Sequence, residues 1–180
     1  MTLRRWLRNI AIDLGLAKPS SVPCPTPIDL GAMQRAIQLA DEAAAQGEVP
    51  VGAVVYRTED GTIIGEGSNR REIDHDPAGH AEIIAIRAAA AALGDWRLTG
   101  CSLAVTLEPC PMCAGLIVNS RIARVVFGAR DPKAGAVRTL YNLADDPRLN
   151  HRAVIIPDVM GDRCSEQLKS FFRRLRSGGR

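Results

Sequence analysis

Two short motifs constrain this chain more than any other feature of its sequence: His80-Ala81-Glu82 and, later, Pro109-Cys110-Pro111-Met112-Cys113. One imidazole and two thiolates are typical ligands of a tetrahedral Zn²⁺, and three protein ligands leave the fourth position to water, as in catalytic zinc sites. A glutamate two residues after the histidine supplies a proton-transfer group beside that water. The motifs therefore predict one Zn²⁺ per chain, held by His80, Cys110 and Cys113, with Glu82 as the catalytic residue.

Each motif alone has a weaker interpretation. A C-x-x-C pair can be half of a closed structural zinc site or a redox pair, and an H-x-E triplet can occur by chance. Further histidines and cysteines stand at positions 75, 101, 151 and 164, but none pairs with another at the spacing of a structural zinc site. A thioredoxin-like pair is expected in the first helix after an early strand, and Cys110 comes too late. We favour the open catalytic site, with structural zinc and redox chemistry as the alternatives.

The composition, 46% hydrophobic and 24% charged, is typical of one soluble globular domain. No apolar run approaches the ~20 residues that span a bilayer, so we expect no membrane association. Three cysteines, Cys24, Cys101 and Cys164, stand singly, and the N-terminal stretch lacks the apolar core of a secretory signal. Isolated cysteines are typical of a reducing compartment, and we therefore expect a cytoplasmic protein.

The chain divides into a leader, residues 1–27, and a catalytic domain, residues 28–180. The leader holds a basic, weakly amphipathic stretch followed by a proline- and serine-rich piece at residues 19–25. We expect it to be poorly ordered, and its sequence does not indicate its role. An arginine-rich transit peptide is the alternative.

The domain alternates helices and strands, which predicts an α/β fold with helices packed on a mixed sheet. Asp29 is the expected N-cap of the first helix, whose apolar stripe stops near Gly47. The last helix is expected to turn Leu168, Phe171, Phe172 and Leu175 inward. The expected strands are 49–56, 62–67, 101–107, 123–127 and 153–156, and the further helices are 80–93, 110–119 and 160–176.

The zinc ligands fall at the starts of two of these helices. Cys110 and Cys113 are three residues apart and share one helix face, and Pro111 suits the first helical position. His80 and Glu82 are two residues apart, so both can reach one site only if it lies beyond the helix end. We therefore expect two helix N-termini to converge on the metal, where their dipoles favour thiolate and hydroxide.

Several segments together resemble the bacterial tRNA-specific adenosine deaminases, in the same order along residues 28–176. The segments are Glu48–Ala53, Gly65–Arg70, His80–Ile83, Val105–Gly115, Ser120–Ile122, Val125–Asp131 and Phe171–Arg173. The resemblance implies a three-layer α/β/α cytidine-deaminase-like fold with a central mixed five-stranded sheet, and a homodimer. It also implies hydrolytic conversion of adenosine to inosine at the wobble position of a tRNA anticodon, with the anticodon stem-loop as partner. Residues 28–180 would then be a zinc-dependent deaminase domain.

The resemblance assigns substrate contacts to several further residues. These residues are Asn69, Asp131, Lys133, Phe171, Phe172 and Arg173. Their own sequence context also allows simpler roles: a turn for Asn69, a solvated turn for Asp131 and Lys133, and core packing for the phenylalanines. The run Val137-Arg138-Thr139 departs from the small residues expected in this loop.

Two other functions remain open at this point. A deaminase of a free base or nucleoside, of the guanine or cytosine type, would use the same zinc chemistry. A zinc-stapled RNA-binding module would need neither an open metal position nor Glu82. The net charge of +3 is only mildly basic, but residues 161–180 carry six basic and two acidic side chains. Such a basic end favours a substrate with phosphates, although it can also be a solvated helix face.

Overall fold

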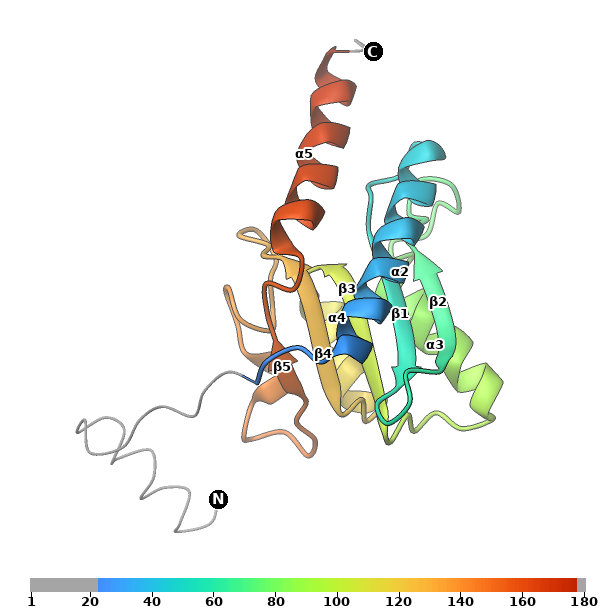
Figure 1. The fold of residues 1–180 in the computed structure, drawn as a ribbon, viewed down its shortest axis with the longest axis vertical. Helices are drawn as coiled ribbons and strands as arrows, with labels where there is room; N and C mark the ends of the chain where they lie inside the picture. The colour runs from blue at the N-terminus through green and yellow to red at the C-terminus, as the bar shows by residue number, and fades with distance from the viewer. Residues whose placement is uncertain (1–22, 178–180) are drawn as a thin grey trace, which may run out of the picture.

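The computed structural model describes residues 23–177, so most of the predicted leader lies outside the described residues (Figure 1). The division between residues 27 and 28 therefore stays a prediction. The elements are α2 (Pro27–Ala45), β1 (Gly52–Arg57), β2 (Ile63–Ser68), α3 (Ala81–Leu93), β3 (Cys101–Leu107), α4 (Pro111–Asn119), β4 (Arg124–Ala129), the 3₁₀ turn η1 (Leu143–Asp145), β5 (Val154–Ile156) and α5 (Gly161–Ser177). Within the described part, no helix combines the length and the apolar character of a membrane span.

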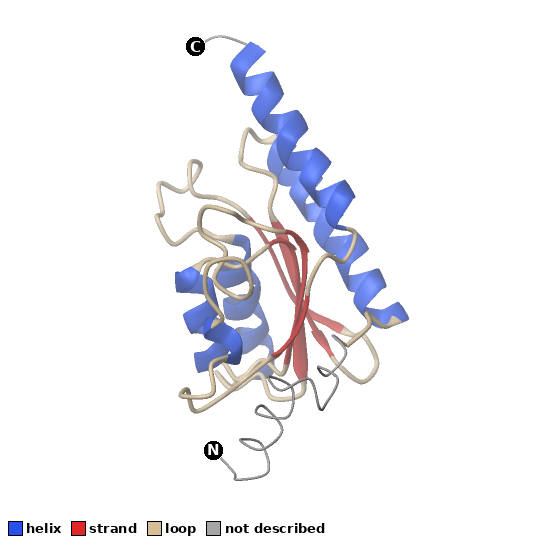
Figure 2. Ribbon diagram, turned by 90° about the vertical axis from the view of Figure 1, so that its left-hand side faces the viewer, coloured by secondary structure: helices blue, strands red, loops and turns tan. Residues whose placement is uncertain are grey.

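The strands form one five-stranded sheet in the order β2-β1-β3-β4-β5. β1 pairs antiparallel with β2 and β3, whereas β3–β4 and β4–β5 are parallel pairs, so the sheet is mixed. Seen edge-on, the sheet lies between two layers of helices (Figure 2). The predicted three-layer α/β/α fold with a mixed five-stranded sheet is confirmed.

Alternation along the strands divides the core in two, because successive side chains of a strand point to opposite faces. On β1, Val55 packs with residues of α3 and α4, such as Ala85 and Ile117. Its neighbours Val54 and Tyr56 pack instead with α2. α2 and α5 therefore cover one face, and α3 and α4 cover the other.

Helix α3 lies very close to β2. A Cβ atom added to Gly67 would lie 2.7 Å from the backbone nitrogen of Ala85 and 2.9 Å from the Cβ atom of Ile84. Both distances are below those that real Cβ atoms show, so only glycine permits this approach. The contact fixes how closely the first turns of α3 approach β2. His80 stands immediately before that helix, so the contact also positions His80.

Several predicted boundaries move by a few residues. The N-cap of α2 is Thr26, and Asp29, predicted as the cap, is the third helical residue of a capping box with Thr26. β1 starts at Gly52, later than predicted, because Pro50 has no N–H to donate to a neighbouring strand. His80 and Cys110, predicted inside their helices, are instead the N-caps of α3 and α4.

The last helix corrects one prediction. Phe171 is buried as expected, but Phe172 and Leu175 are 42% and 58% exposed. The outer turns of α5 extend past the sheet, as Figure 1 shows, so this part of the helix has no strand beneath it. Phe172 does keep an edge-to-face contact with Phe171, with ring centroids 5.5 Å apart.

A buried carboxylate joins the start of α2 to the sheet. Asp29 is 2% exposed and accepts hydrogen bonds from the Tyr56 hydroxyl (2.6 Å), the Arg124 guanidinium (2.6 Å) and the Thr26 N–H (2.7 Å). Burial alone raises the pKa of Asp29, but the hydrogen bonds from Thr26, Tyr56 and Arg124 outweigh it and hold the pKa below its usual value.

Replacing Asp29 with asparagine should therefore destabilise the fold by about 3 kcal/mol at neutral pH, since it removes the charge opposite a largely buried arginine. A group whose pKa is lowered by folding stabilises the protein above its unfolded pKa and stops doing so as the pH falls. The difference in unfolding free energy between wild type and D29N should consequently shrink below about pH 4, as measured by denaturant titration at several pH values. Asp60→Asn, in an exposed turn, is the control and should change the unfolding free energy little.

Candidate active site

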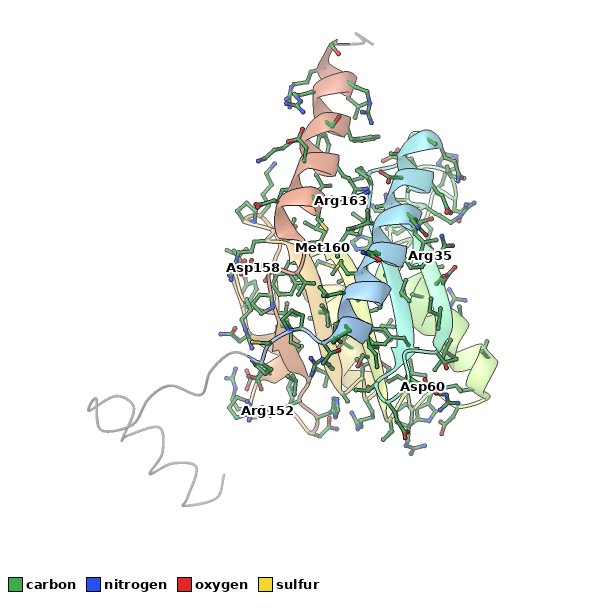
Figure 3. All side chains as sticks on the ribbon, in the orientation of Figure 1. Arg35, Asp60, Arg152, Asp158, Met160 and Arg163 are labelled. Atoms are coloured by element: carbon green, nitrogen blue, oxygen red, sulfur yellow. The ribbon has the colours of Figure 1, made fainter. Side chains whose placement is uncertain are left out.

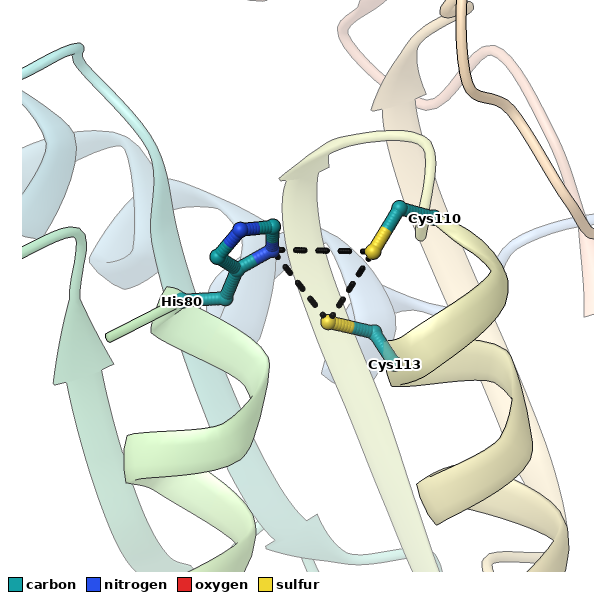
Figure 4. A group of neighbouring side chains, drawn as sticks. All are labelled: His80, Cys110 and Cys113. Atoms are coloured by element: carbon teal, nitrogen blue, oxygen red, sulfur yellow. Dashed lines mark hydrogen bonds between the residues drawn. The ribbon is translucent and has the colours of Figure 1, made fainter. Parts of the chain in front are cut away.

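The predicted metal ligands lie together at the carboxyl end of β3, where two helices begin. His80 Nδ1 is 3.6 Å from Cys110 Sγ and 3.5 Å from Cys113 Sγ, and the two sulfurs are 3.6 Å apart (Figure 4). Within residues 23–177 this is the one cluster of three or more His, Cys, Asp and Glu side chains arranged to hold a metal ion. Sequence reasoning thus brought together residues that lie 30 or more positions apart.

These separations fit zinc. Tetrahedral Zn²⁺ with bonds of about 2.0–2.1 Å to nitrogen and about 2.3 Å to sulfur requires neighbouring ligand atoms about 3.6–3.8 Å apart. The three observed separations fall at this value, and the donor set of one imidazole and two thiols is one that zinc prefers. The cluster can therefore hold one zinc ion and leaves a fourth tetrahedral position without a protein ligand among the described residues.

The local backbone explains how the ligands meet. His80 and Cys110 each occupy an N-cap with extended backbone, so their side chains project beyond the ends of α3 and α4. Pro111 follows at the first helical position, where its missing N–H costs nothing. The converging helix N-termini favour negative charge at the metal site, as the sequence predicted. The contact between the two thiols lowers the pKa of Cys110 and raises that of Cys113, so Cys110 is the thiol that ionises first.

Glu82 lies beside this cluster and is 4% exposed. Desolvation by burial raises the pKa of its carboxyl above the usual value. A buried carboxyl with a raised pKa can both accept and return a proton. Glu82 is not one of the three clustered ligands, in keeping with its predicted role as a proton carrier.

A cavity of about 220 Å³ opens onto these residues. Its lining consists of Val49, Val51, Asn69, Arg71, His80, Ala81, Glu82, Leu107, Glu108, Cys110, Asp131 and Ala134. Two of the predicted substrate contacts, Asn69 and Asp131, therefore share a wall with the metal ligands. Lys133 is exposed nearby and donates its backbone N–H to the Asp131 carboxylate at 2.8 Å. Phe171, Phe172 and Arg173, on α5, do not line this cavity.

Asn69 lies at the end of β2 and is buried rather than placed in a solvated turn. Its N–H donates to the carbonyl of Val51 at 2.9 Å, and its side-chain amide donates to the Glu48 carboxylate at 2.7 Å. Glu48 is fully buried and also accepts the N–H groups of Glu72 and Ile73, both at 2.8 Å. The amide of Asn69 is therefore held in one orientation at the cavity wall.

Sequence reasoning assigned no role to two buried carboxylates: Glu108, which lines the cavity, and Glu48, which holds the cavity residue Asn69. Glu48 lies in the connection between α2 and β1 and precedes Val49-Pro50, and Glu108 directly follows β3 and precedes Pro109. A charged residue at the border of an apolar run is the signal that could have marked them, because such a residue is rarely buried unless its charge is compensated.

A larger cavity lies elsewhere. A surface groove of about 1010 Å³ runs between α2 and the start of α5, where Figure 3 labels Asp158, Met160 and Arg163. It contains neither the metal ligands nor Glu82. We take the smaller cavity as the active site, because chemistry depends on the grouped ligands and not on volume.

Comparison with known proteins supports this assignment. Residues 27–129 match the model of the cytidine and deoxycytidylate deaminase zinc-binding region. The tRNA-specific adenosine deaminase of Bacillus subtilis is 49% identical over 144 residues, which cover 80% of this chain and 88% of the relative. The enzyme of the same name from Haemophilus influenzae is 46% identical, covering 80% of this chain and 83% of the relative.

A solved structure from work on A-to-I editing by tRNA:A34 deaminases at the wobble position superposes with a TM-score of 0.72. It is 40% identical in sequence, and the match covers 77% of this chain and 99% of that one. The arrangement of zinc ligands, the three-layer fold and these matches agree. The chain belongs to the family of tRNA-specific adenosine deaminases, which carry the zinc-binding region of the cytidine and deoxycytidylate deaminases.

Proposed function

We propose that this protein converts adenosine to inosine at the wobble position of a tRNA anticodon, with release of ammonia. The observation that carries the proposal is the open cluster of His80, Cys110 and Cys113 beside the buried Glu82, in a chain whose relatives carry the name of this activity. A free base or nucleoside of the guanine or cytosine type is the alternative substrate. It is less supported, because the relatives that are 46% and 49% identical over four-fifths of the chain are named tRNA-specific adenosine deaminases.

Glu82 performs the proton transfers in this proposal. A Zn²⁺ ion held by His80, Cys110 and Cys113 would lower the pKa of a water molecule at the open position toward ~7 and would so supply a nucleophile at neutral pH. The Glu82 carboxylate takes one proton from the water and delivers it to the purine ring nitrogen beside the amine-bearing carbon. The oxygen of this water bonds to the amine-bearing carbon, and Glu82 carries the remaining water proton to the amine as the carbon–nitrogen bond breaks, so that adenosine and water yield inosine and ammonia.

The other cavity residues orient the nucleoside. Asn69 precedes the metal ligands in the sequence and Asp131 follows them. Both present polar groups to the cavity that they line. Lys133, Phe172 and Arg173 lie outside that lining and are exposed, so we propose that they contact nucleotides flanking the reacting adenosine, whereas the buried Phe171 supports the ring of Phe172. The exposed ring of Phe172 is available for base stacking.

The direct test is incubation of the purified protein with an anticodon stem-loop carrying adenosine at the wobble position. We expect inosine in the digested RNA, detected by mass spectrometry. Guanine, cytosine, cytidine and free adenosine are assayed in parallel under the same conditions. Turnover of a free base or nucleoside without turnover of the stem-loop would favour the alternative.

The arginines at the end of α5 should contribute to RNA binding. Arg173, Arg174 and Arg176 are all exposed on the turns that extend past the sheet. Replacing the three with glutamine should weaken stem-loop binding and flatten its salt dependence. Each phosphate of single-stranded RNA that an arginine neutralises contributes ~0.7 to the slope of log K against log salt, so the loss of all three arginines should lower the slope by about 2.1.

Binding curves at three salt concentrations measure this slope. The matched control replaces Arg57, Arg97 and Arg148, which are exposed at the other end of the strands, and removes the same charge. A slope that changes equally in both triple variants would mean that net charge, and not α5, governs binding.

We also propose that the protein is a cytoplasmic homodimer. The dimer rests on the resemblance to the family, and the compartment rests on the free cysteines, two of them buried outside the metal cluster. Light scattering at micromolar concentration should report twice the chain mass of 19.4 kDa. A monomer that is fully active under the same conditions would contradict the dimer.

A further inference from the structure

We propose that Glu108 is a positioning residue: its carboxylate fixes residues 131–139, which we call the wall loop, against the segment that carries the zinc ligand Cys110. The wall loop carries Asp131 and Ala134 into the lining of the active-site cavity. The consequence for substrate binding rests on the proposed function. The consequence for the loop itself does not.

The carboxylate of Glu108 holds both ends of the wall loop. Its Oε1 atom accepts the N–H groups of Arg138 and Thr139, both at 2.8 Å, and that of Val137 at 3.4 Å. Its Oε2 atom accepts the N–H of Asp131 at 3.2 Å and the hydroxyl of Thr139. One side chain, 2% exposed, therefore ties the first residue of the loop to its last three.

The loop is moulded around this carboxylate. A Cβ atom added to Gly135 would lie 2.5 Å from Cδ and Oε2 of Glu108 and 2.6 Å from the carbonyl oxygen of Asp131. Real Cβ atoms essentially never approach so closely, so the middle of the loop has no room for a larger residue. The contact shows that Glu108 fills the inside of the loop and does not merely touch its edge.

Glu108 also joins the loop to the metal centre. It stands two residues before Cys110, and its backbone N–H donates to the carbonyl oxygen of Ala129 at 2.8 Å. The neighbouring Pro109 carbonyl accepts the N–H of Ala136 at 2.8 Å. Glu108, Cys110 and Asp131 line the same cavity, so the anchor of the loop and a zinc ligand share one short backbone segment.

The chemistry of the contacts requires an anion. Every group that faces the two oxygens in these contacts is a donor, four backbone N–H groups and one hydroxyl. Converging N–H groups stabilise a buried carboxylate without a cationic partner. A glutamine at this position has nearly the same shape, but its NH₂ group would face N–H donors on one side of the loop. That mismatch should open the loop while leaving the zinc ligands unchanged.

The experiment compares Glu108→Gln with wild type by amide hydrogen exchange and by kinetics. We expect one zinc per chain in both proteins and at least tenfold faster exchange of amides 131–139 in E108Q. If only about a tenth of the molecules then hold a competent loop, the KM for the anticodon stem-loop rises about tenfold, while kcat at saturation stays within threefold. Thr139→Val, which removes the hydroxyl contact and keeps the carboxylate, should show a smaller change of the same kind.

Asp29→Asn is the matched control, because it makes the same chemical change at another carboxylate that is 2% exposed. It should lower stability without changing exchange in the wall loop or the KM. Unchanged exchange of amides 131–139 in E108Q would overturn the proposal. If E108Q fails to fold, unchanged exchange in T139V would overturn it equally. A wild-type protein that makes no inosine would refute the proposed function, whereas the exchange result would still decide the role of Glu108 in the loop.

Discussion

Replacing Glu82 with glutamine should leave the fold and the bound zinc intact and reduce the rate of deamination by about 10²–10⁴-fold. This is the usual contribution of a positioned acid–base residue. Glutamine keeps the shape of the buried side chain and removes its ability to carry a proton. The carboxyl is 4% exposed, so bulk water has little access to replace it. Zinc content and the single-turnover rate are measured on the same preparation.

Glu66→Gln serves as the control for this change. Glu66 is half-buried on β2 and pairs with Arg35, which is labelled in Figure 3, at 2.7 Å. The variant should lose some stability and retain its rate. If E82Q stays within tenfold of wild type, the proton passes through another group and the assignment of Glu82 is wrong.

Replacing Cys113 with alanine should abolish both zinc binding and activity. Only two protein ligands would then remain, and the affinity of a zinc site depends on the full donor set. Metal content should fall from one zinc per chain to near zero, and added zinc should not restore the rate. The thermal midpoint should also fall, because a bound metal stabilises only the folded state.

The chain offers a matched control for the loss of a buried thiol. Cys164 is 1% exposed, like the fully buried Cys113, but it lies on α5 outside the metal cluster. Cys164→Ala should lose stability by a similar packing mechanism while it keeps one zinc per chain. Zinc retained at full occupancy in C113A would show that Cys113 is not a ligand.

The sequence predicted the metal cluster because ligand chemistry imposes a spacing that the chain displays directly. His80 and Cys110 are N-caps. The inference that both helices have their N-termini at the metal site needed only helix geometry. Runs of β-branched and apolar residues likewise predicted every strand, although β1 began later than expected at Gly52. Local rules of this kind need no knowledge of how distant segments meet.

The features that sequence reasoning missed depend on such meetings. Glu48 and Glu108 are acceptors only because loops far along the chain turn their N–H groups toward them. Phe172 has the helical spacing of a core residue, yet the neighbouring elements leave 42% of it exposed. Periodicity gives the direction of a side chain, but the end of the neighbouring element decides whether anything lies there.

The close contact of α3 with β2 through Gly67 has a consequence for how this protein can acquire new substrates. The ligand His80 stands at the start of α3, which is pressed against β2, whereas Asn69 is held by the buried Glu48 and the wall loop is held by the buried Glu108. Mutations in the walls can reshape recognition without moving the ligands, while a single methyl group at Gly67 would displace the reactive centre. Laboratory evolution should therefore find mutations that alter specificity in the wall loop and around Asn69, and almost none along the contact between α3 and β2.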